Sequence, residues 1–306
     1  MTRLTSDRGR QGTYSIVARD SASGELGVAV QSHWFSVGPI VPWARAGVGA
    51  VATQANVEIS YGPRGLDLLA GGLDAKAALE RLVAEDPGAA GRQVALVDAN
   101  GTVAAHTGNS CTPFAGDCQA DGVSCQANIM ASDRVWPAML EAYLSTEGSL
   151  TTRLLAALDA AEAVGGDVRG RQSAAILIVP ADGQTWDTLM SLRVEDHPEP
   201  LAELRRLVAL DGAYAIAGRA DDLVNEARFD EAARLYQDAS ALIPDSAELR
   251  FWAGLGAAQE GELDRGVRDV QAAIAQHAGW RELLERLPSE VAPSAQPVLE
   301  RLRQLD

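Results

Sequence analysis

The chain has 306 residues, of which 47% are hydrophobic and 22% are charged, an ordinary globular composition with room for about two domains. Its formal net charge of −16 argues against a nucleic-acid partner and against binding to an anionic membrane, because both need clustered lysine and arginine. No apolar run approaches the about 18 residues of a transmembrane helix, and the polar residues 1–12 do not resemble a secretory signal, so we expect a cytoplasmic protein.

The chain up to about residue 200 predicts strands and helices in mixed order. Two hairpins are indicated, one around Ser21-Ala22-Ser23-Gly24 and one around Asn100-Gly101. In chain order, the predicted elements are strands at 13–20, 25–32 and 46–55, helices at 63–70 and 74–84, strands at 93–98, 102–107 and 122–130, helices at 133–144 and 150–164, and strands at 172–179 and 188–194. Two antiparallel sheets with helices packed outside satisfy this order, so the predicted fold class is α+β.

The chain after His197-Pro198-Glu199-Pro200 has an almost entirely helical pattern and repeats itself. Large and small residues recur at an interval of 34 residues: Phe229, Ala232, Tyr236 and Ala239, then Leu263, Gly266, Val270 and Ala273. This period is typical of tetratricopeptide repeats, with a generic helical hairpin as the alternative. The predicted division is therefore an N-terminal tail at 1–12, a mixed domain at 13–200 and a helical tetratricopeptide-like domain at 201–306.

Three cysteines, Cys111, Cys118 and Cys125, are spaced seven residues apart. An odd number of cysteines does not give a closed set of disulfides. The spacing does not match CxxC zinc patterns, although His106 is nearby. We therefore expect three reduced thiols and no metal site.

Several long stretches, in order along the chain, resemble one bacterial family. They are GTYSIVARDSASGELGVAVQSHWFSVG, VPWARAGVGAVATQA, SYGPRGLDLL, RQVALVDANGTVAAHTG and GGDVRGRQSAAILIV, and VEDHPEPLAELRRLV extends the likeness into the linker. The family is domain of unknown function 1028, an uncharacterised group similar to the N-terminal-nucleophile (Ntn) hydrolases. The resemblance covers residues 12–200 and implies a four-layer αββα sandwich, and known members carry varied C-terminal extensions, some tetratricopeptide-like. It does not imply a particular substrate.

The resemblance points to Thr13 as a nucleophile. In Ntn hydrolases a Thr, Ser or Cys at the mature N-terminus attacks the substrate, and its own α-amine, with an ordinary pKa of about 7.7–8.0, takes the side-chain proton. Many family members begin Met-Thr, whereas twelve residues precede Thr13 here. A free amine requires cleavage between Gly12 and Thr13, a junction of the kind that self-processing Ntn enzymes cut. The alternative is that Thr13 only begins an edge strand and the tail stays attached.

The resemblance also implies residues that support the nucleophile. Asp167, in a glycine-rich loop, would steady the amine, and Asn128 would hold the amine or a tetrahedral oxygen. Backbone N–H groups near Thr53 and Gln54 would contribute to an oxyanion hole. The structural alternatives are a loop-stabilising acid–arginine pair for Asp167, a turn residue for Asn128 and an ordinary polar strand end for Thr53.

Four further residues are predicted to contact the substrate. Ser15 shares a strand face with Thr13, because strand side chains alternate with a period of two. His33 would adjust the amine or orient the substrate, with a packed imidazole as the alternative. Arg169 or Arg171 would bind a substrate carboxylate in a bidentate manner.

The predicted function is hydrolysis of an amide bond in a small metabolite or peptide, without a cofactor or a metal. The competing prediction is a non-catalytic Ntn-fold protein whose helical repeats bind a protein partner. A third prediction assigns the repeats to formation of a homodimer.

Overall fold

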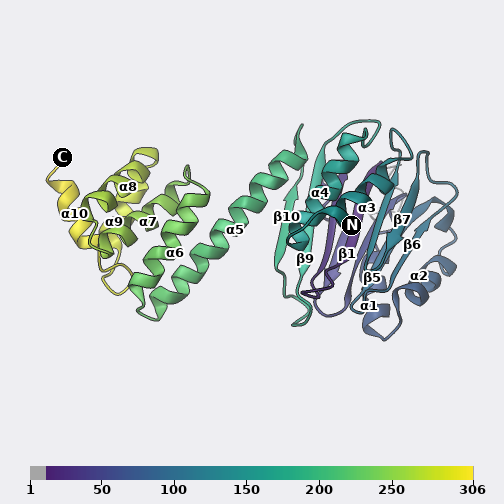
Figure 1. The fold of residues 1–306 in the computed structure, drawn as a ribbon, viewed down its shortest axis with the longest axis horizontal. Helices are drawn as coiled ribbons and strands as arrows, with labels where there is room; N and C mark the ends of the chain where they lie inside the picture. The colour runs from purple at the N-terminus through teal and green to yellow at the C-terminus, as the bar shows by residue number, and fades with distance from the viewer. Residues whose placement is uncertain (1–11, 306) are drawn as a thin grey trace, which may run out of the picture. The chain divides into compact units, whose positions relative to one another are not determined.

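The computed structural model describes residues 12–305, and the chain divides within helix α5 (Pro200–Asn225) into two compact units (Figure 1). Unit 1 ends at Arg205 and unit 2 begins at Arg206. Of the predicted N-terminal tail only Gly12 belongs to the described residues, so the tail stays a prediction. The predicted domain boundary at residue 200 also stays a prediction. Within residues 12–305, no helix combines the length and the apolar character that a bilayer span needs.

Unit 1 contains two antiparallel sheets, as the mixed α and β pattern predicts. The larger has the strand order β10-β9-β2-β1-β8-β7 and the smaller the order β3-β4-β5-β6. The strands of the larger sheet are β1 (Thr13–Arg19), β2 (Leu26–Ser32), β7 (Gly116–Ala120), β8 (Val123–Asn128), β9 (Ser173–Val179) and β10 (Met190–Val194). Those of the smaller sheet are β3 (Pro42–Arg45), β4 (Gly49–Ala55), β5 (Arg92–Asp98) and β6 (Val103–Thr107).

An apolar cluster joins the two sheets face to face. Val17, Val28 and Val30 of the larger sheet pack in one buried cluster with Ala52 and Val97 of the smaller sheet. The central strands are buried on both faces, with β2 and β4 buried at every position. This double burial explains why their sequences are apolar without a regular polar alternation.

Helices cover the other face of each sheet. The bounds are α1 (Tyr61–Ala70), α2 (Ala75–Ala84), α3 (Val135–Ser145) and α4 (Leu150–Ala163), with a short 3₁₀ turn at Ala89–Gly91. Helices α1 and α2 pack with Val51 and Leu96 of the smaller sheet, while α3 and α4 contact β8, β1 and β2. Gly27 allows the close approach of α4, since a Cβ there would lie 2.9 Å from Leu154 Cδ1.

Two edge strands escape prediction from the sequence. Strand β3 has four residues and begins with Pro42, and β7, with the sequence GDCQA, is almost without apolar residues. Both lie at the edge of their sheet, where one partner strand suffices and proline is tolerated. Neither therefore carries the run of apolar residues by which a central strand is recognised.

Unit 2 is helical, as its sequence pattern predicts. Its elements after α5 are α6 (Phe229–Leu242), α7 (Ala247–Gln259), α8 (Leu263–Gln276), α9 (Gly279–Arg286) and α10 (Ala295–Arg303). Helices α6 and α8 begin at Phe229 and Leu263, the first pair of residues in the sequence repeat. The other repeat positions are buried: Ala232, Tyr236, Ala239, Gly266, Val270 and Ala273.

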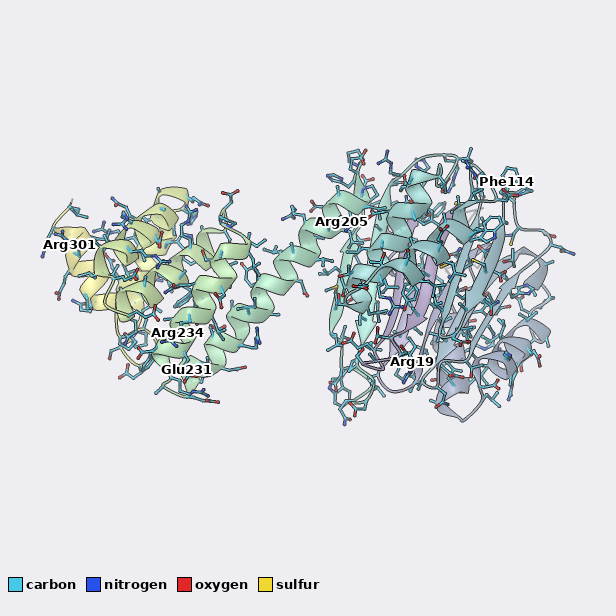
Figure 2. All side chains as sticks on the ribbon, in the orientation of Figure 1. Arg19, Phe114, Arg205, Glu231, Arg234 and Arg301 are labelled. Carbon is cyan, nitrogen blue, oxygen red and sulfur yellow. The ribbon has the colours of Figure 1, made fainter. Side chains whose placement is uncertain are left out.

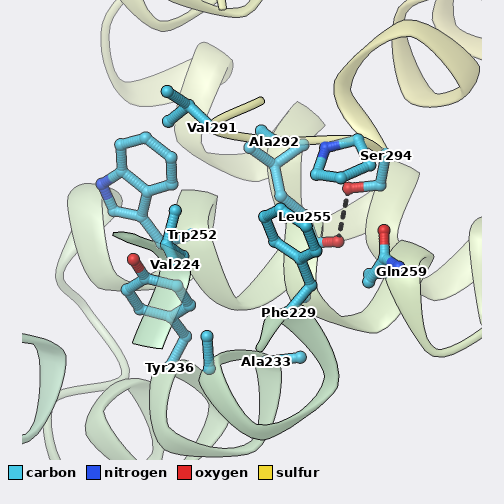
Figure 3. Close-up of a pocket in the computed structure, with 13 residues that line it drawn as sticks. Val224, Phe229, Ala233, Tyr236, Trp252, Leu255, Gln259, Val291, Ala292 and Ser294 are labelled. Carbon is cyan, nitrogen blue, oxygen red and sulfur yellow. Dashed lines mark hydrogen bonds between the residues drawn. The ribbon is translucent and has the colours of Figure 1, made fainter. Parts of the chain in front are cut away.

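An apolar pocket lies within unit 2, between α6, α7 and the segment that precedes α10 (Figure 3). The rings of Tyr236 and Trp252 line it and stack with their centres 5.9 Å apart. Ser294 Oγ donates to the carbonyl oxygen of Leu255 at 2.7 Å, so this polar atom is satisfied within the protein. Charged side chains such as Glu231 and Arg234 lie on the surface of α6 (Figure 2).

Substitution of Gly266 tests the packing of α7 against α8. A Cβ at Gly266 would lie 2.5 Å from the carbonyl oxygen of Gly254, a backbone atom with little freedom to move. We expect Gly266→Ala to lower the free energy of unfolding by about 1–3 kcal/mol, the usual cost of overpacking. Thermal unfolding followed by circular dichroism measures the change.

The matched control is Gly218→Ala in α5, where a Cβ would meet no atom within 4 Å. This change is expected to stabilise the chain by about 0.5–1 kcal/mol, because alanine is the better helix former. Equal effects of the two substitutions would contradict the packing described for α7 and α8.

Candidate active site

Thr13 lies at the beginning of β1, on the face that looks toward the smaller sheet. Its register partners are Ser32 on β2 and Asn128 on β8. Side chains alternate along β1, so Tyr14 points the other way and donates to Glu162 of α4 at 2.5 Å. Thr13 and Ser32 are 0% exposed and Asn128 is 1% exposed, so the three polar side chains meet away from solvent.

The carbonyl oxygen of Gly12 accepts two hydrogen bonds from side chains. Ser32 Oγ donates to it at 2.5 Å and Arg169 Nη2 donates at 3.0 Å. Thr13 Oγ1 lies 3.0 Å from Ser32 Oγ. A hydroxyl has a single proton, and Ser32 uses its proton toward Gly12, so Thr13 is the donor in this contact. A directed chain of hydrogen bonds thus runs from the Thr13 hydroxyl through Ser32 to the Gly12 carbonyl.

Asp167 lies against Gly12 and is held in place from several directions. Its carboxylate accepts from the backbone N–H of Arg169 at 2.9 Å and from the Arg169 guanidinium at 3.1 and 2.8 Å. The backbone N–H of His33 adds a contact at 3.3 Å, and the Asp167 side chain is 0% exposed. A Cβ built on Gly12 would lie 2.5 Å from Asp167 Oδ2, so the carboxylate lies against the residue that precedes Thr13.

Glycines shape the loop that carries Asp167. Gly165, Gly166 and Gly170 have φ values of 112°, 51° and 101°, a region that side-chain-bearing residues seldom adopt. The loop returns to the sheet through a bridge between Asp167 and Met130. The unusual sequence GGDVRG is thus explained by the tight path that brings Asp167 and Arg169 to Gly12.

Buried amide side chains connect Thr13 to the smaller sheet. Gln54 donates to the carbonyl oxygen of Thr13 at 3.3 Å and to Gln93 Oε1 at 2.8 Å. Asn128 donates to the same Gln93 oxygen at 3.0 Å. Ser15 donates to Gln54 Oε1 at 2.6 Å and accepts from Gln126 at 2.7 Å. These bonds fix the end of β1 on both sides.

A small pocket is lined by Asn128 and by residues near the ends of β4 and β8. Ala55 and Ile129, which follow Gln54 and Asn128 directly, line it with φ values of 66° and 60°. Positive φ is a genuine outlier for a β-branched residue such as Ile129 and costs about 1–3 kcal/mol. Such strain is concentrated at functional sites, and here it lies beside the polar cluster.

The structure brings Thr13, Ser15, Asn128, Asp167 and Arg169 into one hydrogen-bonded cluster, and the backbone of His33 also reaches it. The backbone N–H of His33 donates to Asp167. The buried Nδ1 of the His33 ring has no hydrogen-bond partner in the described part of the chain.

Thr53 and Arg171 are engaged away from this cluster. The backbone N–H of Thr53 donates to Val41 and its hydroxyl donates to Glu58, so neither is free to hold an oxyanion. Arg171 pairs with Glu162 and Glu199 instead of approaching Gly12.

Sequence reasoning missed Ser32, Gln93 and Gln126. A signal for them exists in β8, where Ser124, Gln126 and Asn128 place a polar residue at every second position of an otherwise apolar strand. Ser124, Gln126 and Asn128 are all buried, which is unusual for these residue types and indicates a shared polar face.

The cysteines are free thiols, and Cys111 lines the same small pocket as Asn128. Burial raises the pKa of Cys111 and raises that of Cys118 to about 11. Burial also raises the pKa of Cys125 well above its ordinary value. A raised pKa keeps a thiol protonated and weakly nucleophilic near neutral pH. Among residues 12–305, no group of three His, Cys, Asp or Glu side chains is arranged to hold a metal ion.

Asp167→Ala tests whether the buried carboxylate holds the site together. The substitution leaves the Arg169 guanidinium, 30% exposed, without its partner, and we expect a loss of about 3 kcal/mol in the free energy of unfolding. Urea unfolding followed by fluorescence measures the loss.

The control is Asp67→Ala, which breaks the ion pair with Arg45, in which the Asp67 side chain is 69% exposed. An exposed pair of this kind contributes less than about 1 kcal/mol. Losses of the same size in the two variants would show that Asp167 has no special structural role.

Comparisons with known proteins agree with the resemblance seen in the sequence. Residues 13–204 match a family described as a family of unknown function (DUF1028). A crystal structure of protein SPO2555 from Silicibacter pomeroyi, also of DUF1028, is 31% identical with a TM-score of 0.60, covering 64% of this chain and 88% of that one. Anbu (ancestral beta-subunit) from Yersinia bercovieri is 14% identical with a TM-score of 0.34, over 63% of this chain and 91% of its own, which is too distant to inform on fold or function. No curated protein matches the chain. By its match over residues 13–204, the chain belongs to the DUF1028 family.

Proposed function

We propose that unit 1 is a four-layer αββα sandwich of the Ntn-hydrolase type and that Thr13 is the nucleophile of an amide hydrolase. In this proposal the chain first cleaves its own Gly12–Thr13 bond. The observation that carries it is the Gly12 carbonyl, whose oxygen accepts from Ser32 and Arg169 while Thr13 donates to Ser32. A carbonyl held by two donors, one of them cationic, is suited to the formation of an oxyanion.

Self-cleavage uses the hydrogen-bond chain as a proton path. As Thr13 Oγ attacks the Gly12 carbonyl carbon, its proton passes to Ser32 and the Ser32 proton passes to the Gly12 oxygen. Arg169 stabilises the same oxygen in the tetrahedral intermediate. The proton then moves from that oxygen to the Thr13 nitrogen as the C–N bond breaks, which leaves an ester between Gly12 and Thr13 Oγ. Water hydrolyses the ester to a Gly12 carboxylate and a free Thr13.

The freed α-amine of Thr13 then acts as the base in turnover. Its ordinary pKa of about 7.7–8.0 lets it take the hydroxyl proton near neutral pH and pass it to the leaving amine. The Asp167 carboxylate stabilises the transient ammonium, and Asn128, which donates to the Thr13 carbonyl oxygen at 3.5 Å, keeps the strand end in position. The mechanism requires no cofactor and no metal. Arg169 orients the substrate carbonyl, and Arg171, paired with Glu162 and Glu199, supports the loop.

In the same proposal, the helices of unit 2 pack as tetratricopeptide-like repeats, which the burial of the repeated positions supports. It also retains a homodimer and a cytoplasmic location as expectations. A non-catalytic protein that binds a partner through unit 2 is the alternative, and it requires no cleavage before Thr13.

Variants of Thr13 and Ser32 separate these two proposals. We expect intact-mass measurements to show that the purified wild-type chain becomes shortened to begin at Thr13, whereas Thr13→Ala stays uncut. Ser32→Ala removes one donor to the Gly12 oxygen, which should slow cleavage by about 10²–10³-fold.

Thr13→Ser keeps a hydroxyl and should still cut, and Ser191→Ala, on the exposed edge strand β10, should cut at the wild-type rate. A wild-type chain that keeps its N-terminal residues, or a Thr13→Ala chain that is cut at the same bond, would rule out the proposed self-cleavage.

A further inference from the structure

The space beside Gly12 excludes a side chain. A Cβ built on Gly12 would lie 2.5 Å from Asp167 Oδ2, 2.9 Å from Asp167 Cγ and 2.6 Å from Arg169 Nη2. These separations are shorter than van der Waals contact allows. Some neighbouring group would have to move to admit even a methyl group.

The neighbouring carboxylate has little freedom to move. Asp167 is fully buried and accepts from the backbone and the guanidinium of Arg169 and from the backbone of His33. Displacing it would break several charge-assisted bonds at once, each stronger than a neutral hydrogen bond. A side chain at position 12 is therefore excluded by a carboxylate that the loop holds in place.

Self-cleavage and turnover both pass through an ester in which the acyl group is bonded to Thr13 Oγ. In both, a carbonyl carbon becomes esterified to Thr13 Oγ, and its oxygen needs donors in the same region. Gly12 therefore marks the position that the acyl part of a substrate occupies in the mature site. This step rests on the proposed function.

We infer that the mature site is specific for glycyl amides, in which the carbon next to the cleaved carbonyl carries no side chain. Gly12 is itself joined through its nitrogen to Gln11, so the glycine of a substrate can be N-acylated or can end a peptide segment. The Asp167 and Arg169 side chains select this class by steric exclusion, while Arg169 and Ser32 hold the carbonyl oxygen.

The inferred reaction is balanced without a further reactant other than water. Thr13 Oγ forms a C–O bond to the glycyl carbonyl carbon and its proton passes through the α-amine to the leaving nitrogen. The amide C–N bond breaks and the amine departs. Water then cleaves the ester to give an N-substituted glycine carboxylate and restores the Thr13 hydroxyl.

Cleavage of the full chain gives the first test, with intact mass as the readout. Gly12→Ala places a methyl group where the structure has no room, and we expect self-cleavage to slow by at least about 10²-fold, the scale on which a 1 Å misplacement acts. Gly218→Ala, in the open part of α5, should cut at the wild-type rate. If the wild type and Gly12→Ala cut equally fast, the inference fails while the proposed function stands. An uncut wild-type chain contradicts both.

A second test uses the full protein after cleavage, so it does not depend on folding of a variant. The probes are the 7-amino-4-methylcoumarin amides of N-acetylglycine and of N-acetyl-L-alanine, followed by fluorescence. We expect kcat/KM to be at least about 10²-fold higher for the glycyl amide, by the same geometric argument. Equal rates, or faster cleavage of the alanyl amide, overturn the inference alone. Cleavage of neither amide by a chain that begins at Thr13 contradicts the hydrolase proposal and the inference with it.

Discussion

The contact between the Asp167–Arg169 pair and Gly12 is the constraint on which the candidate site depends. The carboxylate is buried and is neutralised by the guanidinium beside it, and the guanidinium in turn donates to the Gly12 carbonyl. Burying a carboxylate in this way is costly unless it is paired and hydrogen-bonded, and here both conditions are met. The same pair thus fixes the loop, polarises the carbonyl and closes the space next to the glycine.

The buried amides give this contact a rigid support. A cluster of polar side chains between two sheets is destabilising unless its members satisfy one another. Gln54 and Gln93 do so, because each amide contacts both a neighbouring side chain and a strand carbonyl. The outcome is a strand end whose backbone is held from the opposite sheet. Such fixed geometry is what attack on a neighbouring carbonyl needs, since small misplacements are costly in rate.

Much of this arrangement is predictable from the sequence, and the exceptions have physical causes. The central strands, the helices and the helical C-terminal unit follow from apolar patterns, whereas β3 and β7 are too short or too polar to be recognised. The sequence also singles out Thr13, Asn128 and Asp167 through a family resemblance. It does not reveal the part played by Ser32, because the contact between Ser32 and Gly12 depends on strand register rather than on a local pattern.

Positions that depend on tertiary contacts are the ones sequence reasoning places least well. Thr53 lies near the end of β4, but its hydrogen bonds to Val41 and Glu58 are made by segments that no local pattern connects to it. Arg171 is two residues from Arg169, yet it turns to Glu162 and Glu199. Two arginines of one loop thus have different partners. Only the tertiary structure determines that Arg169, and not Arg171, contacts Gly12.

The central claim is that Thr13 becomes a free N-terminal nucleophile, and covalent labelling tests it most directly. The purified full-length protein would be incubated with a β-lactone, an electrophile that acylates activated hydroxyl groups, and the adduct would be located by peptide mass mapping. The account predicts a single adduct on Thr13, in a peptide that begins with this residue, and labelling that rises with pH as the α-amine loses its proton. An adduct on another residue, or a Thr13 that stays joined to Gly12 and unlabelled, would contradict it.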